Sequence, residues 1–420
     1  MIEIKNQNKH RILSMLVIVC GLLYIFAYQF KLPFKADVFL YGMVVGLVIM
    51  TLFDGKIVVS KQVALFILVA ISSFIGLSYT TMPSEGLREA ILFTFFSGLF
   101  WLSLINLAFI RSFIKWIYIA SVIVVLSSII HFLAPLWFNG LMSQVMREDA
   151  YEQLMWSFTV DTTFAGLSAY TPNTTFAAAI VFGNSFLNIT PKKETPIISN
   201  KSLNLILLAL SMFVIIICSK RGIFVATIVA LIVLMFYLYR GRNFFLKFLG
   251  VAVLSSVVLI IFYNTNEFVS AFLNRFVGDD IMTGRDTIYK ILMADFGESN
   301  FLIGRGTAAT YELAEKGAHN IYIQILYDHG ILFSLPYYIL LLYNYYLAFK
   351  NKCPISIFVQ TMFLVYGLSG NPLYSNMFMM IYIYHVLYAA KMPALVRTNN
   401  ESKRTKICRN AARMLKERRG

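Results

Sequence analysis

Charged side chains are scarce in this sequence. Asp, Glu, Lys and Arg make up 14% of its 420 residues, against about 25% in an average soluble domain. Hydrophobic residues make up 59%, and the mean hydropathy is +0.71. A water-soluble fold is therefore not expected.

Cysteine is scarce too, and its four copies are scattered. Cys20, Cys218, Cys353 and Cys408 form no CxxC pair, which is a spacing that redox and metal sites commonly use. The sequence therefore predicts neither a disulfide framework nor a metal site, and we expect no cofactor.

The apolar residues come in blocks of about 16 to 21, close to the length that a helix needs to cross a hydrocarbon core of about 30 Å. Strands of a membrane barrel would alternate in polarity, and these blocks do not. We expect an all-α, polytopic integral membrane protein with about 12 transmembrane helices. The predicted spans are Ile12 to Phe30, Ala36 to Phe53, Val63 to Tyr79, Ala90 to Ile110, Phe113 to Phe132, Thr174 to Ile189, Leu203 to Cys218, Gly222 to Tyr239, Phe244 to Tyr263, Ile321 to Phe349, Ile355 to Leu368 and Tyr374 to Ala390.

The basic residues predict the orientation. Counted with both termini inside, the inner side carries 25 basic and 5 acidic residues, and the outer side 11 basic and 16 acidic residues. The positive-inside rule therefore predicts cytoplasmic termini. The tail 391–420 carries ten Lys or Arg, which favours electrostatic anchoring to the phospholipid membrane over binding of nucleic acid.

Residues 1–390 are expected to form a single transmembrane domain, followed by the basic cytoplasmic tail 391–420. Two long loops, 135–173 and 264–318, fall on the outer face, and loops of this length usually carry a binding or catalytic task. The second loop should contain short helical pieces such as Asp286 to Ala294. After it, Gly330 and Pro336 interrupt the span Ile321 to Phe349, so Asn320 to His329 is expected either as a separate half-helix or as part of one kinked helix.

Two basic residues, Lys220 and Arg221, form most of a tight turn on the outer side, where basic residues are disfavoured. One interpretation is that they snorkel to lipid phosphate. The other is a binding site for a phosphate-bearing lipid substrate, because a guanidinium group grips phosphate in a bidentate fork. Arg275, Arg285 and Arg305 in the second loop add to this, unless they only pair with nearby acids.

His319 precedes an apolar helix on the same outer side. A helix amino terminus disfavours the imidazolium form, so His319 is expected to be neutral and able to accept a proton. A capping or interfacial histidine is the alternative. Asp328 lies about 13 Å further along a continuous helix and cannot orient His319 there.

The sequence around these residues resembles the O-antigen ligase and polysaccharide polymerase family of bacterial envelopes. The strings that match are Thr171-Pro172-Asn173, Ser219-Lys220-Arg221-Gly222, Thr283-Gly284-Arg285-Asp286, Leu302-Ile303-Gly304-Arg305-Gly306, Ala318-His319-Asn320-Ile321-Tyr322 and Asp328-His329-Gly330. Each string is weak alone, and their order and spacing over Thr171 to Gly330 make the combination specific. Arg305 stands where the family varies, and Asp328 stands near the place of a more usual glutamate.

The resemblance implies a GT-C-like fold in the bacterial inner membrane and a metal-independent, inverting glycosyltransferase. The substrate it implies is an undecaprenyl-diphosphate-linked oligosaccharide at the outer leaflet. Arg221 and Arg285 would hold the diphosphate and His319 would act as the base, so these three are the expected catalytic residues. The expected substrate-binding residues are Lys220, Arg305, Asn320, Asn173 and Asp328. A chain-length regulator and a flippase of the same pathway are the expected protein partners.

Three functions stay open at this point. A polymerase of O-antigen or capsule repeat units is favoured by the second loop and the overall layout. A ligase that transfers glycan to lipid A core shares the same strings. A flippase for lipid-linked oligosaccharides, from a different class, would predict charged residues inside the spans and two related halves.

Overall fold

The computed structural model describes residues 2–54, 59–104, 107–152, 171–190, 198–218, 220–239, 284–298, 301–315 and 317–392, and isolated positions between 246 and 274. All regular structure in these ranges is helical, with no strand, so the all-α class is confirmed for the part described. The elements are α1 Ile2–Phe30, α2 Asp37–Asp54, α3 Lys61–Leu77, α4 Pro83–Ser103, α5 Leu107–Leu133, α6 Pro135–Val145, α8 Thr171–Ile189, α9 Lys201–Ile217, α10 Arg221–Leu238, α13 Arg285–Glu298, α14 Thr310–Leu313, α15 Ile321–Lys350, α16 Pro354–Tyr366 and the 3₁₀ turn η2 Pro372–Tyr374. Residues 376–392 form a further helix.

Within the described ranges, four helices are long and apolar enough to cross a membrane: α1 over Arg11–Phe30, α5 over Phe109–Leu133, α10 and α15. Shorter apolar helices lie at Asp37–Phe53, Lys61–Leu77, Lys201–Ile217 and Pro354–Tyr366. The expected span Phe244 to Tyr263 lies mostly outside the described residues, as does the tail from 393 onward. The described part of the chain is therefore all-helical and has the apolar helices of an integral membrane protein, and the count of twelve crossings stays a prediction.

Helix α4 differs from the span expected at Ala90 to Ile110. It begins seven residues earlier, at Pro83, and ends at Ser103. Proline fits the first helical position because its missing N–H is not needed there. The charge at Glu89 does not stop the helix, and this side chain is only 5% exposed. The fourth apolar helix therefore carries a buried carboxyl group that the hydropathy pattern assigned to a loop.

Helix α15 is broken at Gly330, whose backbone is non-helical with φ 61° and ψ −174°. The expected half-helix before this break is present. The segment 301–306 pairs with the break: Arg305 N donates to Tyr327 O at 3.1 Å and Gly306 N to Asp328 O at 2.8 Å. Ile331 N and Leu332 N donate to Phe301 O and Leu302 O, each at 2.9 Å. These bonds satisfy the backbone groups that the break leaves without helical partners.

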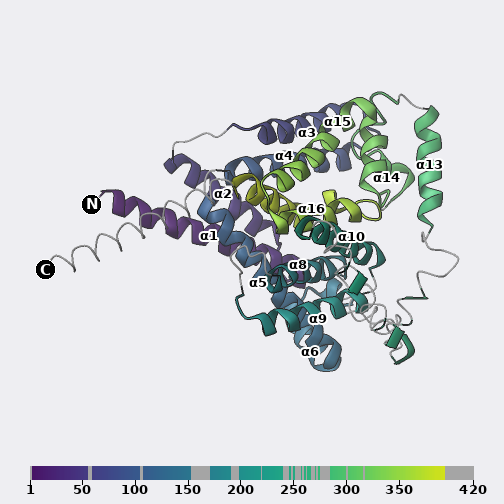
Figure 1. Ribbon diagram of the computed structural model, residues 1–420. Helices are drawn as coiled ribbons and strands as arrows, with labels where there is room; N and C mark the ends of the chain where they lie inside the picture. Colours follow the sequence, from purple (N-terminus) through teal and green to yellow (C-terminus); the bar gives the residue numbers. More distant parts are fainter. Residues whose placement is uncertain are drawn as a thin grey trace.

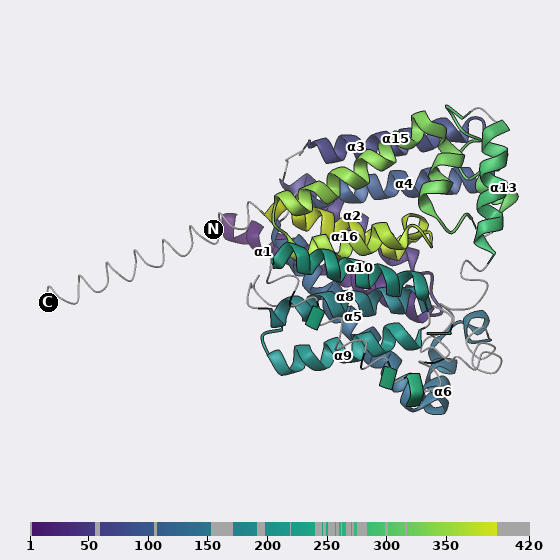
Figure 2. The same cartoon turned by 45° about the vertical axis from the view of Figure 1, so that its right-hand side comes forward.

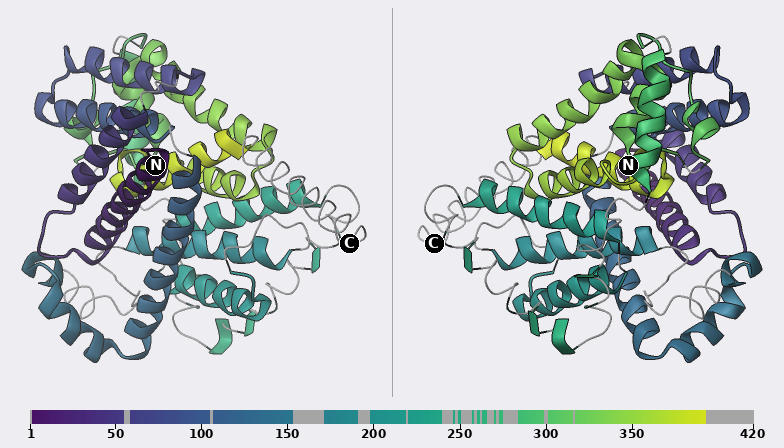
Figure 3. Two further views of the ribbon diagram at one scale, coloured as in Figure 1. Left: turned by 90° about the vertical axis from the view of Figure 1, so that its left-hand side faces the viewer. Right: turned by 90° about the vertical axis from the view of Figure 1, so that its right-hand side faces the viewer.

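Most of the long helices run side by side, with the first turns of α1 at one end of the bundle and α13 at the other (Figures 1 and 2). Seen end-on, α13 crosses the face that is turned to the viewer in the right panel of Figure 3. We call this the α13 end of the bundle. It also carries the start of α10, the start of α15, the end of α16 and α14.

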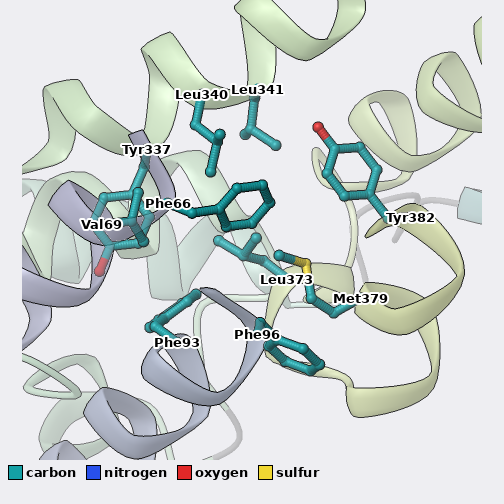
Figure 4. A pocket seen from close by; sticks show the side chains of 10 residues that line it. All are labelled: Phe66, Val69, Phe93, Phe96, Tyr337, Leu340, Leu341, Leu373, Met379 and Tyr382. Carbon is teal, nitrogen blue, oxygen red and sulfur yellow. The ribbon is translucent and has the colours of Figure 1, made fainter. Parts of the chain in front are cut away.

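The interior between α3, α4, α15 and the helix 376–392 is tightly packed. Figure 4 shows ten side chains from these elements and the adjoining 3₁₀ turn around an apolar void of about 10 Å³. The phenol of Tyr337 is paired inside this region: it shares a hydrogen bond of 2.6 Å with Ser73 and lies 3.0 Å from His329 Nε2. This packing holds the start of α15 and the end of α16 in place at the α13 end.

Candidate functional site

The basic pair Lys220 and Arg221 stands at the start of α10, at the α13 end. Lys220 is the exposed residue before the helix and Arg221 is its half-buried first residue. A helix amino terminus carries a partial positive charge and unpaired N–H groups, both of which favour anions. Gly222 follows because space is short there: a Cβ would collide with Ser369 and lie 3.4 Å from Tyr366 Cδ2. The start of α10 therefore packs against the segment just after α16.

Arg285 is the first residue of α13 and follows Gly284, whose φ is +74°. Its charge acts on two phenols, Tyr289 one turn further along α13 and Tyr366 at the end of α16. Burial raises the pKa of Tyr289, while Arg285 and Asn320 oppose this rise. Arg285 is thus close to Tyr366, the same side chain that borders Gly222.

His319 lies two residues before α15, in a left-handed backbone conformation with φ 52°. Its carbonyl oxygen accepts a hydrogen bond from Tyr289 Oη at 3.4 Å. Asn320 caps the helix, its side-chain oxygen accepting from Tyr322 N at 3.0 Å and from Ile323 N at 3.2 Å. The expected position of His319 at a helix start is confirmed, and its half-buried side chain is held by a fixed backbone.

The end of α16 joins these elements. Ile321 N, two residues after His319, donates to Gly367 O at 2.9 Å. A Cβ at Gly222 would touch Tyr366, and Arg285 acts electrostatically on Tyr366. Arg221, Arg285 and His319 therefore stand on three elements that meet around residues 366–369. We call this region the arginine site.

The sequence did not point to Tyr366 or Tyr289 as members of the site. An aromatic residue at the end of an apolar span is common at membrane interfaces, so composition gave no reason to select Tyr366. The only signal near it is the run Gly367 to Asn371 after the span, which contains two glycines.

Arg305 is paired with Asp295, about 15 Å along α13 from Arg285. Its Nε and a terminal nitrogen donate to the two oxygens of Asp295 at 2.9 and 2.6 Å, and Tyr327 Oη donates to Asp295 at 2.6 Å. Burial acts to raise the pKa of Asp295, but these hydrogen bonds and the charge of Arg305 outweigh it and the pKa is lowered. A role for Arg305 on a diphosphate stays a prediction, and it would require this ion pair to open.

Two other expected binding residues are buried. Asp328 is fully buried, and one carboxylate oxygen accepts from Thr310 N at 2.8 Å and Thr310 Oγ1 at 2.7 Å. Asp328 thereby ties α14 to α15. Asn173 is 6% exposed in the first turn of α8. That turn is near the start of α10, because Thr175 is hydrogen-bonded to Cys218 just before Lys220.

The arginine site combines two guanidinium groups, a lysine, a helix amino terminus and a half-buried imidazole. Such a set can hold a doubly charged phosphate group and take a proton from a nearby hydroxyl. Among the described residues, no group of three or more His, Cys, Asp or Glu side chains is placed to hold a metal ion. Positive charge is supplied here by arginine and lysine.

An all-helical membrane protein with a cationic site at one end of its bundle is the class that the fold defines. Residues 206–338 match the family model described as O-antigen ligase. The match contains Arg221, Arg285 and His319, and it confirms the resemblance to the O-antigen ligase and polysaccharide polymerase family. At the level of class, the matched family implies glycosyltransferase-like ligase or polymerase activity. The comparison with curated proteins finds no match.

Proposed function

We propose that this protein is an oligosaccharide repeat-unit polymerase that joins undecaprenyl-diphosphate-linked repeat units at the outer leaflet of the bacterial inner membrane, in the synthesis of O-antigen or capsule. One observation carries the proposal: the elements that carry Arg221, Arg285 and His319 come together around residues 366–369, at one end of an apolar bundle. Chemistry on a lipid-linked diphosphate needs cations and a base together at the membrane edge.

In this mechanism Arg221 and Arg285 bind the diphosphate of the donor, with Lys220 adding charge. His319 takes the proton of an acceptor hydroxyl, and the hydroxyl oxygen attacks the anomeric carbon of the donor sugar. The bond between that carbon and the diphosphate oxygen breaks, and the lipid diphosphate leaves with the bonding electrons. Attack from the face opposite the leaving group inverts the anomeric centre. The guanidinium groups stabilise the charge that develops on the diphosphate, so the reaction needs no metal ion.

The side of the membrane follows from the charges of the sequence. Helix α13, which belongs to the net acidic stretch 264–318, lies at the α13 end, and the start of α1, with Lys5, Lys9 and Arg11 in the sequence, lies at the opposite end. We therefore place the arginine site on the extracytoplasmic face and both termini in the cytoplasm. A flippase would deliver the lipid-linked units to this face, and a chain-length regulator would act beside the polymerase.

The test is reconstitution of the purified protein in vesicles with a defined lipid-linked repeat unit. A ladder of longer lipid-linked chains, with release of one undecaprenyl diphosphate per step, is the expected result. Transfer of a single unit to added lipid A core would show a ligase instead. Movement of the lipid-linked unit across the bilayer without any new glycosidic bond would show a flippase. Either of these two outcomes, or no product, overturns the polymerase proposal.

A further inference from the structure

A second hollow opens at the α13 end, between α2, α4, α14 and the segment 374–376. Its volume is about 450 Å³, within the range of about 300 to 1,000 Å³ that is usual for small-molecule sites. Four acidic residues line it and one basic residue: Asp37, Glu85, Glu89, Glu315 and Arg88. We call it the carboxylate cavity. Its charge is opposite to that of the arginine site, so it does not suit a phosphate group.

Glu89 is a buried carboxyl group of this cavity whose hydrogen-bonding capacity is not satisfied by any described residue. Its side chain is 5% exposed, and neither of its carboxyl oxygens has a hydrogen bond of normal geometry in the described chain. The Tyr311 hydroxyl lies near the Glu89 carboxyl group and makes a weak hydrogen-bonding interaction with it, outside normal hydrogen-bond geometry. Burying a carboxyl group without hydrogen-bond partners is costly in either protonation state. The buried hydroxyl of Tyr374, also on the cavity wall, has no hydrogen-bond partner among the residues that the structure describes.

The lining fits sugar hydroxyl groups. Carboxylates accept strong hydrogen bonds from O–H donors, and the aromatic rings of Tyr41, Tyr311 and Tyr374 offer flat apolar faces beside them. A divalent cation is the other chemistry that carboxylates serve. The described side chains include no group of three or more potential ligands arranged for one. A neutral, hydroxyl-rich ligand is therefore favoured.

The carboxylate cavity borders the segment that carries His319. A Cβ at Gly317, two residues before His319, would lie 3.5 Å from Tyr311 Cε1 and 2.8 Å from Asn371 Nδ2. The same segment also contacts the arginine site: His319 O accepts a hydrogen bond from Tyr289 Oη of α13, and Ile321 N donates to Gly367 O. The backbone around His319 thus borders both the carboxylate cavity, through Tyr311, and the arginine site, through Tyr289 and Gly367.

We propose that the carboxylate cavity is the acceptor subsite, where Glu89 and the tyrosines bind the sugar hydroxyls of the glycan that receives the transferred unit. This assignment rests on the proposed function, because the protein binds an acceptor glycan only if it transfers glycan. The division is electrostatic: the donor diphosphate binds at the arginines, and the uncharged end of the acceptor binds at the carboxylates.

The experiment uses a probe without phosphate, the free oligosaccharide released by mild acid from the lipid-linked repeat units of the producing cells. Its binding to the purified protein in lipid nanodiscs is measured by saturation-transfer NMR titration. Wild-type protein is expected to bind it. Glu89→Gln is expected to weaken binding about tenfold, because an amide replaces the carboxylate that accepts from the hydroxyls. Arg285→Lys should bind it as the wild type does.

Two further variants complete the design. Tyr41 is 61% exposed, so Tyr41→Ala removes a ring from the cavity rim without opening the core, and it should also weaken binding. If Glu89→Gln does not fold, Tyr41→Ala alone tests whether the carboxylate cavity binds the oligosaccharide. Glu148 is exposed on the segment between α6 and residue 152, away from the cavity lining, and Glu148→Gln serves as the matched control with unchanged binding.

The subsite is overturned if wild-type protein does not bind the oligosaccharide, if a folded Glu89→Gln variant binds it as the wild type does, or if binding is lost in Arg285→Lys. Calcium binding at the cavity with no sugar binding also overturns it. Failure of the polymerase proposal is distinguishable, because it is seen as absence of chain extension by wild-type protein. Intact chain extension with an unchanged KM for acceptor in Glu89→Gln would remove the subsite alone.

Discussion

At the scale of single residues, binding of a diphosphate at the arginine site depends on how a guanidinium group differs from an ammonium group. Arg285 at the start of α13 and Arg221 at the start of α10 both stand where N–H groups and helix dipoles already favour an anion. An arginine adds a planar fork that matches two phosphate oxygens, whereas a lysine adds a point charge. The shape of the cation should therefore matter as much as its charge.

Arg285→Lys keeps the charge and removes the fork. Chain extension in reconstituted vesicles should fall about 100-fold or more, by analogy with the loss of one preorganised donor at a developing oxyanion. Arg147 is a control, because it is paired with Asp149 at 3.0 Å on the exposed segment that follows α6, and Arg147→Lys should extend chains normally. Full activity of Arg285→Lys would argue against its grip on the diphosphate.

A substitution that tests His319 must keep its left-handed backbone conformation. Its φ of 52° lies in the left-handed region, where asparagine is found more readily than most other residues. His319→Asn therefore removes the base while keeping the turn. Chain extension should drop by about 10² to 10⁴, the usual contribution of a general base, while the melting temperature stays close to that of the wild type. Retained activity would assign His319 to capping.

The sequence located Arg221, Arg285 and His319 because each stands in a short polar string next to an apolar span. It could not place Tyr289 and Tyr366 in the site, because their role depends on contacts between α13, α15 and α16. It also assigned the charge at Glu89 to a loop, since hydropathy does not reveal that a carboxyl group is buried against other helices.

At the scale of elements, the break in α15 organises the α13 end. Gly330 and Pro336 indicated a break or a kink. The pairing of residues 301–306 with the broken turn could not be foreseen, because a backbone ladder of this kind has no side-chain signature. This pairing explains Gly304 in the sequence Leu302 to Gly306. The backbones at Gly304 and Gly330 approach each other so closely that a Cβ on either residue would collide with the other segment.

Gly330→Ala tests this packing. A non-glycine residue at φ 61° and ψ −174° costs about 1 to 3 kcal/mol, and the new Cβ would meet Ile303 at 2.6 Å. The amount of folded protein in the membrane and its melting temperature should both fall. Gly297→Ala is the matched control, since nothing lies within 4 Å of its Cβ position, and helical alanine is more stable than glycine. Equal stability of both variants would contradict the role of the break.

Helix α13 is docked by Asp295 as well as by a small apolar cluster that includes Leu292 and Phe296. The pKa of Asp295 is lowered in the folded protein. Its contribution to the stability of the docked α13 is therefore fully present at pH values above the unfolded pKa of about 3.9. It is lost as the pH falls through the lower folded pKa. Docking of α13 should therefore not change between pH 5 and pH 8.

Asp295→Asn should reproduce the acid effect at neutral pH. Amide hydrogen exchange of residues 285–298 is expected to become faster, because the charged hydrogen bonds to Arg305 are lost. Chain extension should weaken with it, since α13 carries Arg285. Exchange in this helix that is the same in wild type and variant at pH 7 would show that the apolar cluster alone holds α13.

At the scale of the whole molecule, composition and charge predicted an all-helical membrane protein, and the described helices confirm that class. The number of crossings and the orientation are still predictions. Hydropathy is a sound guide to apolar helices because backbone polar groups must be satisfied inside lipid. It is a poor guide to boundaries, as α4 shows, because buried polar groups at helix ends depend on tertiary contacts.

The orientation can be checked with alkaline phosphatase fusions. A fusion in the segment 31–36 between α1 and α2, or after residue 298 at the end of α13, should be active, since both sites are expected outside the cytoplasm. A fusion after residue 352, between α15 and α16, should be inactive. The opposite pattern would place the arginine site in the cytoplasm and exclude a reaction at the outer leaflet.

The most direct measurement is an experimental structure of the protein with a lipid-linked repeat unit bound in nanodiscs. The account predicts that the diphosphate lies within hydrogen-bonding distance of the guanidinium groups of Arg221 and Arg285, with the anomeric carbon facing His319. A diphosphate bound away from both arginines, or a donor sugar that His319 cannot approach, would contradict it.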